Sequence, residues 1–343
     1  MLAIAGIRVL LIAGLGAITL TAPARAADFY AGKTIEIVVG APPAGGFDIY
    51  ARTIARHLPR HIPGNPSVVV KNMQGGGGSR AGLYISTIAP RDGTSLAALM
   101  PGAIMDPLLE GMQNAVFNPN NVSYVGTADN GVRTCVAYGT SKIKSFADAL
   151  AHKSSFGAGN AGNASRDYAY LHNRTSGTKF DIVSGYPGTN EIAIAMERGE
   201  IDGACGWGWS SFKAQRPNWL RDHKVNVLLQ VGLEPNDELT RLGVPHIWTY
   251  VQGEENRKVV ELIIGQQAFQ RPYVGPPGLA PETLALLRKA FDETMSDPQF
   301  KAEADKLHID VAPLSGAAVQ EIVAKLSATP KDIVEKARAA IRP

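Results

Sequence analysis

Apolar and polar positions follow two alternating patterns along this chain, and together they predict an α/β protein. Short apolar runs rich in β-branched residues predict strands. These runs are Ile35–Val39, Val68–Val70, Ser95–Leu99, Cys135–Tyr138, Val225–Val231 and Gln270–Val274. Between them apolar residues recur at helical spacing, as from Ile49 to Leu58, where Pro59 ends the predicted helix. The alternation indicates largely parallel sheets covered by helices.

Start signals mark several of the predicted helices. Ser145 and Asp148 have the spacing of a capping box, in which the side chain of each residue accepts a hydrogen bond from the backbone N–H of the other. Thr189 is predicted to cap a helix that runs to Arg198. Pro281 fits the first position of a further helix, where its missing N–H costs nothing.

Residues 1–26 have the pattern of a secretion signal. Arg8 precedes an apolar stretch, Val9–Leu20, that is too short to span a bilayer comfortably. Ala24-Arg25-Ala26 has the small-residue pattern of a cleavage site. We therefore expect an exported protein that begins near Ala27 and is located in a bacterial periplasm.

Charge and length narrow the class of protein. The formal charge is +3, and removal of Arg8 and Arg25 with the leader lowers it to +1. Such a balance offers no electrostatic reason to bind nucleic acid or an anionic membrane. The length suits two domains, and we place the crossing to a second lobe near Thr127 and the return near Val225. Cys135 and Cys205 could form a disulfide or be two small buried apolar residues.

Motifs typical of enzymes are weak in this chain. Gly157–Gly162 reads GAGNAG and matches GxGxxG, with Asp181 downstream for a ribose contact. Glycine is abundant here, so a chance match is easy, and no HExxH, CxxC or GxSxG occurs. His57 and His61 are separated by Pro59, which breaks the helix face that a metal would need. We therefore predict no enzyme, catalytic residue, cofactor or metal, and keep an exported enzyme as the alternative.

Glycine-rich loops follow predicted strands and form a more coherent set. They are Ala44–Asp48, Gln74–Ser79, Met100–Gly102, Gly159–Ser165 and Tyr186–Thr189. Most lead into a predicted helix, so free N–H groups and the positive end of the helix dipole gather at the ends of the strands. Open α/β sheets bind their ligands there, and such amides hold carboxylate or phosphate groups. Ordinary turns are the alternative.

Side chains beside these loops suggest roles in a cleft. Ser165 and Thr189 can donate hydroxyl hydrogen bonds, and Tyr186 can form an apolar wall with a polar tip. Arg166 could pair with a carboxylate through two hydrogen bonds or lie solvated on the surface. Asp48 could hold waters that bridge to a ligand or simply cap its helix.

Five segments together resemble one family. PPAGGFDIYAR is similar to its FPPGGxxDxxAR loop, and VVVKNMQGGGGSRAG to its VVVxNxxGAGGxxG segment. APRDGTSLAAL, GYPGTNEIAIAMERGEID and PYVGPPGLAPETLALLRKAF match further segments in order and spacing. The chain thus resembles the extracytoplasmic solute receptors of tripartite tricarboxylate transporters, the TctC or Bug family.

The resemblance implies a type II periplasmic-binding-protein fold, with two Rossmann-like lobes joined by a hinge. Lobe 1 would comprise residues 27–127 and 225–343, and lobe 2 residues 128–224. A small organic carboxylate would be held between backbone amides of the two lobes, which close like a Venus flytrap. The implied ligand-binding residues are Ala44, Gly45, Gly46, Phe47, Asp48, Gly102, Asn163, Ala164, Ser165, Arg166, Tyr186, Gly188 and Thr189.

The resemblance also implies partners. Members deliver their ligand to a permease of two integral membrane subunits, TctA and TctB, so we expect such a partner for a monomeric receptor; a signalling sensor is the alternative. The family commonly has S/T-x-H-L where this chain has Ala164-Ser165-Arg166-Asp167-Tyr168. That departure favours a different or longer acid at the distal contact.

Overall fold

A first sheet of six strands organises one half of the molecule. The computed structural model describes residues 29–111 and 117–343, so the expected leader lies outside the described residues. The strand order is β11-β4-β10-β3-β1-β2. In chain order the strands are β1 (Thr34–Val39), β2 (Ser67–Asn72), β3 (Ser95–Ala98), β4 (Ser123–Thr127), β10 (Pro272–Gly275) and β11 (Leu314–Ser315).

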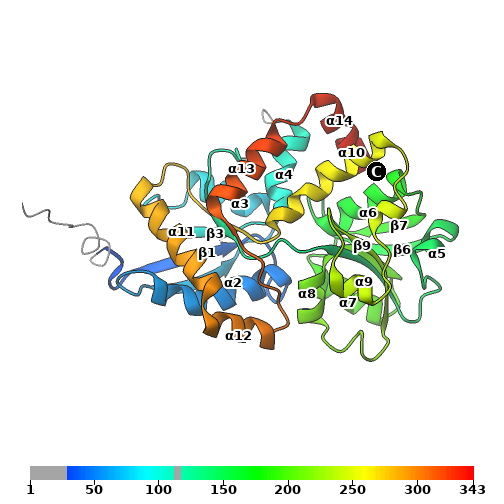
Figure 1. The fold of residues 1–343 in the computed structure, drawn as a ribbon, viewed down its shortest axis with the longest axis horizontal. Helices are drawn as coiled ribbons and strands as arrows, with labels where there is room; N and C mark the ends of the chain where they lie inside the picture. The colour runs from blue at the N-terminus through cyan, green and yellow to red at the C-terminus, as the bar shows by residue number, and fades with distance from the viewer. Residues whose placement is uncertain (1–28, 112–116) are drawn as a thin grey trace, which may run out of the picture.

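A second sheet of five strands organises the other half, in the order β7-β6-β8-β5-β9. Its strands are β5 (Arg133–Tyr138), β6 (Ser154–Ala158), β7 (Phe180–Ser184), β8 (Gly203–Gly208) and β9 (Val225–Val231). The two sheets lie in separate lobes placed side by side, and the chain passes between them after β4 and again before β10 (Figure 1). The molecule is therefore an α/β protein of two lobes, as predicted.

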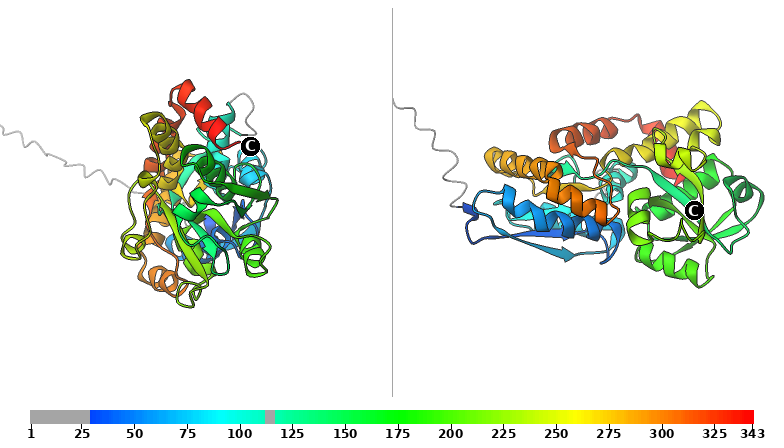
Figure 2. Two further views of the ribbon diagram at one scale, coloured as in Figure 1. Left: turned by 90° about the vertical axis from the view of Figure 1, so that its right-hand side faces the viewer. Right: turned by 60° about the horizontal axis from the view of Figure 1, so that its bottom comes forward.

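Helices cover both sheets (Figure 2). Around the first sheet lie α2 (Gly46–His57), α3 (Ser79–Thr87), α4 (Pro101–Glu110), α11 (Pro281–Ser296), α12 (Pro298–Lys306) and α13 (Gly316–Ser327). Around the second lie α5 (Phe146–Ala151), α6 (Ala164–Thr175), α7 (Thr189–Glu197), α8 (Trp209–Gln215) and α9 (Asp237–Arg241). The helices α10 (Glu254–Ile264) and α14 (Lys331–Ala340) pack on each other, and α14 contacts α4 and α6.

The expectation of largely parallel sheets is wrong, because both sheets are mixed. β1 pairs in parallel with β2 and β3, and β6 pairs in parallel with β7 and β8. β10 runs antiparallel to β3 and β4, and β5 runs antiparallel to β8 and β9. Strands reached by crossing between the lobes enter without a βαβ connection, so they are free of its parallel constraint.

The expected return to the first lobe near Val225 is also corrected. β9 begins at Val225 but pairs with β5 in the second sheet, and the first sheet resumes only at β10. A buried apolar strand has the same sequence pattern in either sheet, so the pattern alone could not assign it.

Two of the three predicted helix starts are confirmed. Ser145 and Asp148 form the capping box, and Pro281 is the first residue of α11. Thr189 is not a cap: α7 begins at Thr189 itself after Gly188, and the Thr189 hydroxyl donates to Gln215 Oε1 at 3.0 Å. The N-cap residue is instead Gly188, whose backbone is extended.

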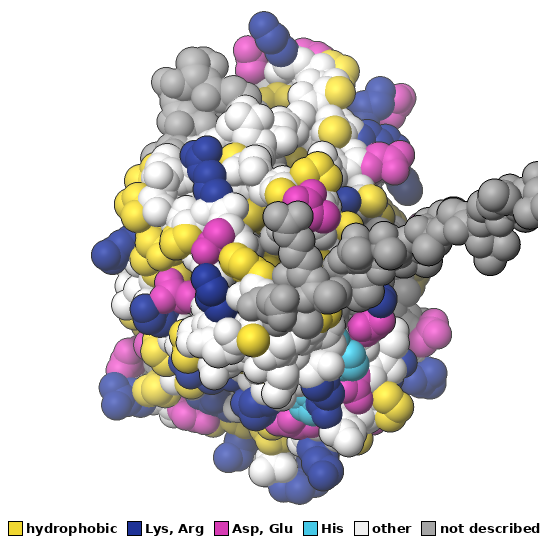
Figure 3. All heavy atoms as spheres, turned by 90° about the vertical axis from the view of Figure 1, so that its left-hand side faces the viewer, with side chains coloured by type: hydrophobic (Ala, Val, Ile, Leu, Met, Phe, Trp, Pro, Cys, Tyr) yellow, Lys and Arg dark blue, Asp and Glu magenta, His cyan; other side chains and the backbone are white. Residues whose placement is uncertain are grey.

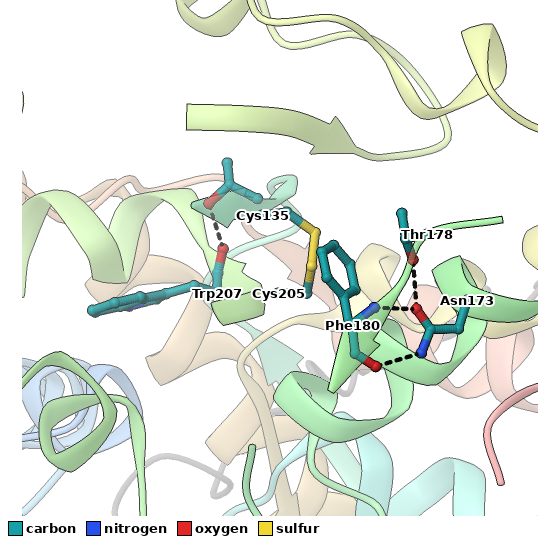
Figure 4. Close-up of a disulfide and its surroundings, with 7 residues drawn as sticks. Cys135, Asn173, Thr178, Phe180, Cys205 and Trp207 are labelled. Atoms are coloured by element: carbon teal, nitrogen blue, oxygen red, sulfur yellow. Dashed lines mark hydrogen bonds between the residues drawn. A yellow bond between two sulfur atoms is a disulfide. The ribbon is translucent and has the colours of Figure 1, made fainter. Parts of the chain in front are cut away.

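Cys135 and Cys205 form a disulfide that joins β5 to the neighbouring strand β8 (Figure 4). Nearby, the Asn173 side chain binds both backbone groups of Phe180, donating to its carbonyl at 2.9 Å and accepting from its N–H at 3.0 Å. The disulfide thus fastens β5 to β8, and the Asn173 side chain fastens α6 to β7.

The surface carries interspersed charges. On the face at the end of the first lobe, basic and acidic side chains alternate without a broad area of one sign (Figure 3). This mixture agrees with the small net charge and gives that face no footprint for a polyanion. Among the described helices, none has the length and apolar content needed to cross a membrane.

Candidate functional site

A cavity lies between the two lobes and is partly open to solvent. Its wall is made of strand-to-helix loops from both lobes and of the segments where the chain crosses between them. The lining residues include two arginines, Arg133 and Arg271, and no carboxylate within the described part of the chain. The wall is therefore positive, with exposed backbone at several loops.

The start of α2 supplies the wall on the first lobe. Gly45 is its N-cap residue and Gly46 its first residue, and no side chain caps this end, so its free N–H groups remain available. A Cβ on Gly46 would lie 2.0 Å from Ser211 Oγ of the second lobe. Only glycine permits this close approach, which brings the loop and α8 together at the cavity.

Asp48 fixes the shape of this loop from behind and does not line the cavity. Its carboxylate accepts from the Ala44 N–H at 2.9 Å, from Arg52 Nε and from Asn72 Nδ2. Burial alone would raise the pKa of Asp48, but these hydrogen bonds outweigh it and hold the pKa below its usual value. Ala44 accordingly keeps a left-handed conformation with φ of 61°. Asp48 therefore neither lines the cavity nor caps α2; it holds the loop that precedes the helix.

Two glycine loops of the first lobe touch the second lobe across the cavity. A Cβ on Gly102, in the first turn of α4, would lie 1.8 Å from the carbonyl oxygen of Gly162. A Cβ on Gly77 would lie 2.6 Å from the carbonyl oxygen of Ala161. The lobes therefore meet through bare backbone, and the structure has them closed on each other.

Around the start of α6, two residues face the cavity and one turns away. Asn163 and Ala164 line it. The Ser165 hydroxyl instead accepts from the Gly159 N–H at 2.9 Å and donates to Asn163 Oδ1 at 2.8 Å. Ser165 thus holds the loop in place rather than reaching a ligand.

Around the start of α7, Gly188 and Thr189 line the cavity, whereas Tyr186 lines an adjoining groove beside Gly75–Gly78. Trp207 also lines the cavity, and its indole N–H donates to Gln215 Oε1 at 3.1 Å. Trp209 stacks inside the second lobe on Phe212. Trp207 therefore lies at the cavity, whereas Trp209 does not.

The structure brings together eight of the thirteen predicted site residues. Those that line the cavity are Gly45, Gly46, Phe47, Gly102, Asn163, Ala164, Gly188 and Thr189. Those that do not are Ala44, Asp48, Ser165, Arg166 and Tyr186. Ala44, Asp48, Ser165 and Tyr186 support or adjoin the loops of the cavity. Arg166 was expected to contact the ligand but contacts other residues of the protein instead.

Arg166 pairs within its own lobe. Its Nη1 lies 3.5 Å from Asp167 Oδ1, and its guanidinium lies over the ring of Tyr170. Asp106 of the first lobe approaches the same place, since a Cβ on Gly162 would lie 2.2 Å from Asp106 Oδ2. Burial and, to a smaller extent, Glu110 raise the pKa of Asp106 to about 7, against the opposing effect of Arg166. Burial and Asp106 likewise raise the pKa of Asp167.

This cluster predicts that Asp106 makes stability fall as pH rises. Between its ordinary pKa of 3.8 and about 7, the folded protein keeps a proton on Asp106 that the unfolded chain has released. The contribution is present at the acid end of this window and is lost as pH approaches 7. Between pH 5 and pH 7, Asp106→Asn, which mimics the protonated form, should remove on the order of 2 kcal/mol of this dependence.

Denaturant unfolding of both proteins from pH 5 to pH 8 measures the difference in their pH dependence, which reports the titration of Asp106 together with its effect on Asp167. Parallel curves for the intact protein and the Asn variant would contradict the role of Asp106.

The GxGxxG motif does not form a dinucleotide site in this structure. The loop Gly157–Gly162 follows the end of β6, but Asp181 lies near the beginning of the parallel strand β7. Asp181 lines a separate surface groove, beside Lys179 and Asp202. A ribose-binding acid would have to lie at the same edge of the sheet as the loop, which this geometry excludes.

Arg133 and Arg271 are two charged cavity residues that the sequence patterns missed. Each is more than nine-tenths buried, at 5% and 3% exposure. Arg133 is the first residue of an apolar strand, and Arg271 immediately precedes another. An arginine at the end of a buried strand was the sequence feature that could have pointed to these two residues. Gln266 and Ser211 also line the cavity without having been predicted.

Comparisons with known proteins place the fold. No family model matches the chain. A curated relative, the UPF0065 protein in the TAR-I ttuE-ttuC' intergenic region of Agrobacterium vitis, is 27% identical over 220 residues. The match spans 62% of this chain and 62% of the relative, which is less than two thirds of its length.

Solved structures are similar over most of the chain. The periplasmic binding protein BugD has a TM-score of 0.68 at 19% identity, covering 91% of this chain and 98% of its own. MatC (Rpa3494) from Rhodopseudomonas palustris with bound malate has 0.66 at 17% identity, covering 90% and 99%. R. palustris Rpa4515 with adipate has 0.67 at 17% identity, covering 90% and 97%. At these identities the likeness establishes a common fold.

Proposed function

We propose that this chain, which has the two-lobe fold of the TctC and Bug periplasmic solute-binding proteins, captures a small organic carboxylate between its lobes. The observation that carries the proposal is the cavity wall. It combines the uncapped start of α2 and further strand-to-helix loops with two buried arginines, and no carboxylate lines it within residues 29–111 and 117–343. Amide hydrogens and guanidinium groups favour an anion there.

The two lobes supply different parts of the binding energy. The ligand first meets one lobe, and the second lobe then adds its amides as the hinge closes. Closure is favoured only by as much as the ligand binds the closed form better than the open one. Hydrogen bonds to a charged group contribute about 1.5–3 kcal/mol each, so three or four of them suffice for micromolar affinity.

Similar proteins support the ligand class. MatC was solved with malate and Rpa4515 with adipate, and both have this fold at TM-scores above 0.6. We propose by analogy that this chain also binds a carboxylate and is located in the periplasm. We further propose delivery to membrane subunits of a tripartite tricarboxylate transporter. A sensor protein that recognises the closed form is the alternative partner, and membrane or sensor-kinase genes beside this one would discriminate between the two.

Calorimetry tests the proposal directly. The intact protein is titrated with malate, succinate, adipate and benzoate, with glucose as an uncharged control. We expect at least one acid to bind at micromolar concentration and the radius of gyration from X-ray scattering to fall on binding. If no acid bound and the scattering did not change, the receptor function would be rejected.

A further inference from the structure

Three side chains that can bind a metal meet inside the second lobe, and none of them lines the cavity. Cys135 of β5, Cys205 of β8 and His172 of α6 place their sulfur and nitrogen atoms within 4.8 Å of one another. All three residues are fully buried, at 0% exposure. The two cysteines form the disulfide of Figure 4, so their sulfurs are not free to bind a metal in this state.

His172 is poorly satisfied at this position, because neither of its ring nitrogens has a hydrogen-bond partner. A neutral imidazole has one N–H donor and one acceptor, and burying both without partners costs free energy. Burial lowers the pKa of His172 to about 3, so the ring is neutral, which is the form that coordinates metals. A disulfide sulfur is a poor hydrogen-bond partner, whereas a metal ion would accept the lone pair of the nitrogen beside it.

The surroundings of the group are apolar and favour a site without net charge. The Phe146 ring meets the His172 ring edge-on, with 5.6 Å between ring centres, and Phe156 stacks on Phe180. These phenylalanines belong to the same buried core as the two cysteines. Two thiolates and a divalent cation sum to zero charge, whereas a monovalent cation would leave a buried negative charge without compensation. The pocket therefore suits a divalent cation.

Ligand chemistry narrows the choice of cation. Thiolate and imidazole groups are the ligands that Zn²⁺ prefers, whereas Ca²⁺ and Mg²⁺ prefer oxygen. A tetrahedral zinc ion holds sulfur and nitrogen ligands about 3.6–3.8 Å from one another, so a shift of about 1 Å brings the imidazole to that distance. The sulfurs separate once their bond is reduced. Among the described residues the group contains no carboxylate, so water would complete the tetrahedron.

We propose that, when the disulfide is reduced, Cys135, Cys205 and His172 bind one divalent cation of the zinc class. A dithiol reductant supplies two electrons and two protons to the disulfide and itself becomes a disulfide. The two thiols then release their protons as they bind the cation, which keeps β5, β8 and α6 linked. The oxidised protein cannot form this site, because its two sulfurs are bonded to each other.

Burial of the group decides when the site can be filled. Because the three residues have no exposed surface, neither a reductant nor a cation reaches them in the folded lobe. The site is therefore filled as the reduced chain folds, before the disulfide forms. Thiols stay reduced until the chain reaches an oxidising compartment, so the cation precedes the disulfide as the link between the two strands.

Refolding of the reduced full chain tests the proposal. The protein is unfolded in denaturant with a phosphine reductant, which takes one oxygen atom from water as the disulfide becomes two thiols. It is then refolded with Zn²⁺ in the absence of oxygen and desalted. We expect one zinc ion per chain by metal analysis, and none in protein refolded with its disulfide intact. With Co²⁺ in place of Zn²⁺, we expect the near-ultraviolet absorption of a bond between thiolate and cobalt.

Variants identify the ligands. The double variant Cys135→Ala with Cys205→Ala should retain no zinc. His172→Leu should bind zinc at least roughly 100-fold more weakly than the intact reduced chain, because one of three protein ligands is lost. His152→Leu removes an exposed imidazole from the same lobe, so its zinc affinity should equal that of the intact reduced chain. Competition with a coloured chelator measures these affinities.

Each result supports or overturns the site. Absence of zinc from the refolded reduced chain, or equal zinc affinity in His172→Leu, would overturn it. If circular dichroism shows that the reduced chain refolds only with Zn²⁺, the site is supported, and failure to refold under both conditions overturns it. If His172→Leu does not fold, imidazole proton resonances shifted by bound Co²⁺ carry the test, and their absence would contradict the histidine ligand. None of these results alters the proposed binding of a carboxylate, which is tested on the oxidised protein.

Discussion

Replacement of Gly102 by alanine is expected to lower affinity for the carboxylate ligand at least roughly 100-fold, because it prevents the lobes from closing. The added Cβ would lie 1.8 Å from the carbonyl oxygen of Gly162 in the opposite lobe. That neighbour is backbone and cannot rotate away. Within its own lobe Gly102 is an ordinary residue of α4 without a positive φ, so alanine suits its local conformation.

The measurement compares two glycines of the cavity wall. Gly45→Ala serves as the comparator, because its added Cβ would meet the Pro42 carbonyl at only 3.4 Å, an ordinary contact. We expect a much smaller loss of affinity in that variant. In Gly102→Ala, scattering should show no compaction when ligand is added, while the unfolding midpoint stays near that of the intact protein. Full compaction with native affinity would show that the contact with Gly162 is not needed for closure.

Removal of the disulfide is expected to cost about 4 kcal/mol of unfolding free energy in the second lobe. Cys135 and Cys205 are separated by 70 residues, so the bond closes a long loop and restricts the unfolded chain. Both cysteines are fully buried between β5 and β8, and the double variant Cys135→Ala with Cys205→Ala leaves no reactive thiol behind.

Tryptophan fluorescence during denaturation measures this cost selectively. The four tryptophans of the chain are Trp207 in β8 and Trp209, Trp219 and Trp248 between β8 and α10, so their signal reports the second lobe. The intact protein treated with dithiothreitol provides the matched control and should shift to the same midpoint as the double variant. A loss below about 1 kcal/mol in both would contradict a stabilising role.

Local chemistry explains what was predictable. The glycine loops at Gly45, Gly102 and Gly188, which line the cavity, could be predicted. A strand, a tight turn and a helix start each require particular residue types, and here they occupy consecutive positions. The Ser145 capping box formed for the same reason. Such features depend on neighbours within a few positions, so a pattern of residue types suffices to predict them.

Other features escaped because they depend on distant partners. The strand at Val225 has the same apolar pattern in either sheet, and its pairing with β5 decided which one it joined. Arg166 stands at a helix start and was expected to reach the ligand, yet the adjacent Asp167 and the ring of Tyr170 engage it instead. Arg133 and Arg271 carried no motif, and only the two crossings of the chain brought them to one cavity.

By itself, the sequence determined the α/β class, most of the helix starts and the backbone loops that can hold an anion, because short-range sterics and hydrogen bonding specify each of them. The tertiary structure decided which strands share a sheet, which loops face one another and which charged side chains are buried between them. Those outcomes depend on contacts between residues far apart in the sequence, such as Phe47 with Arg271 and Gly46 with Ser211. No local pattern encodes such pairings, since the free energy that selects them arises only when both lobes are packed.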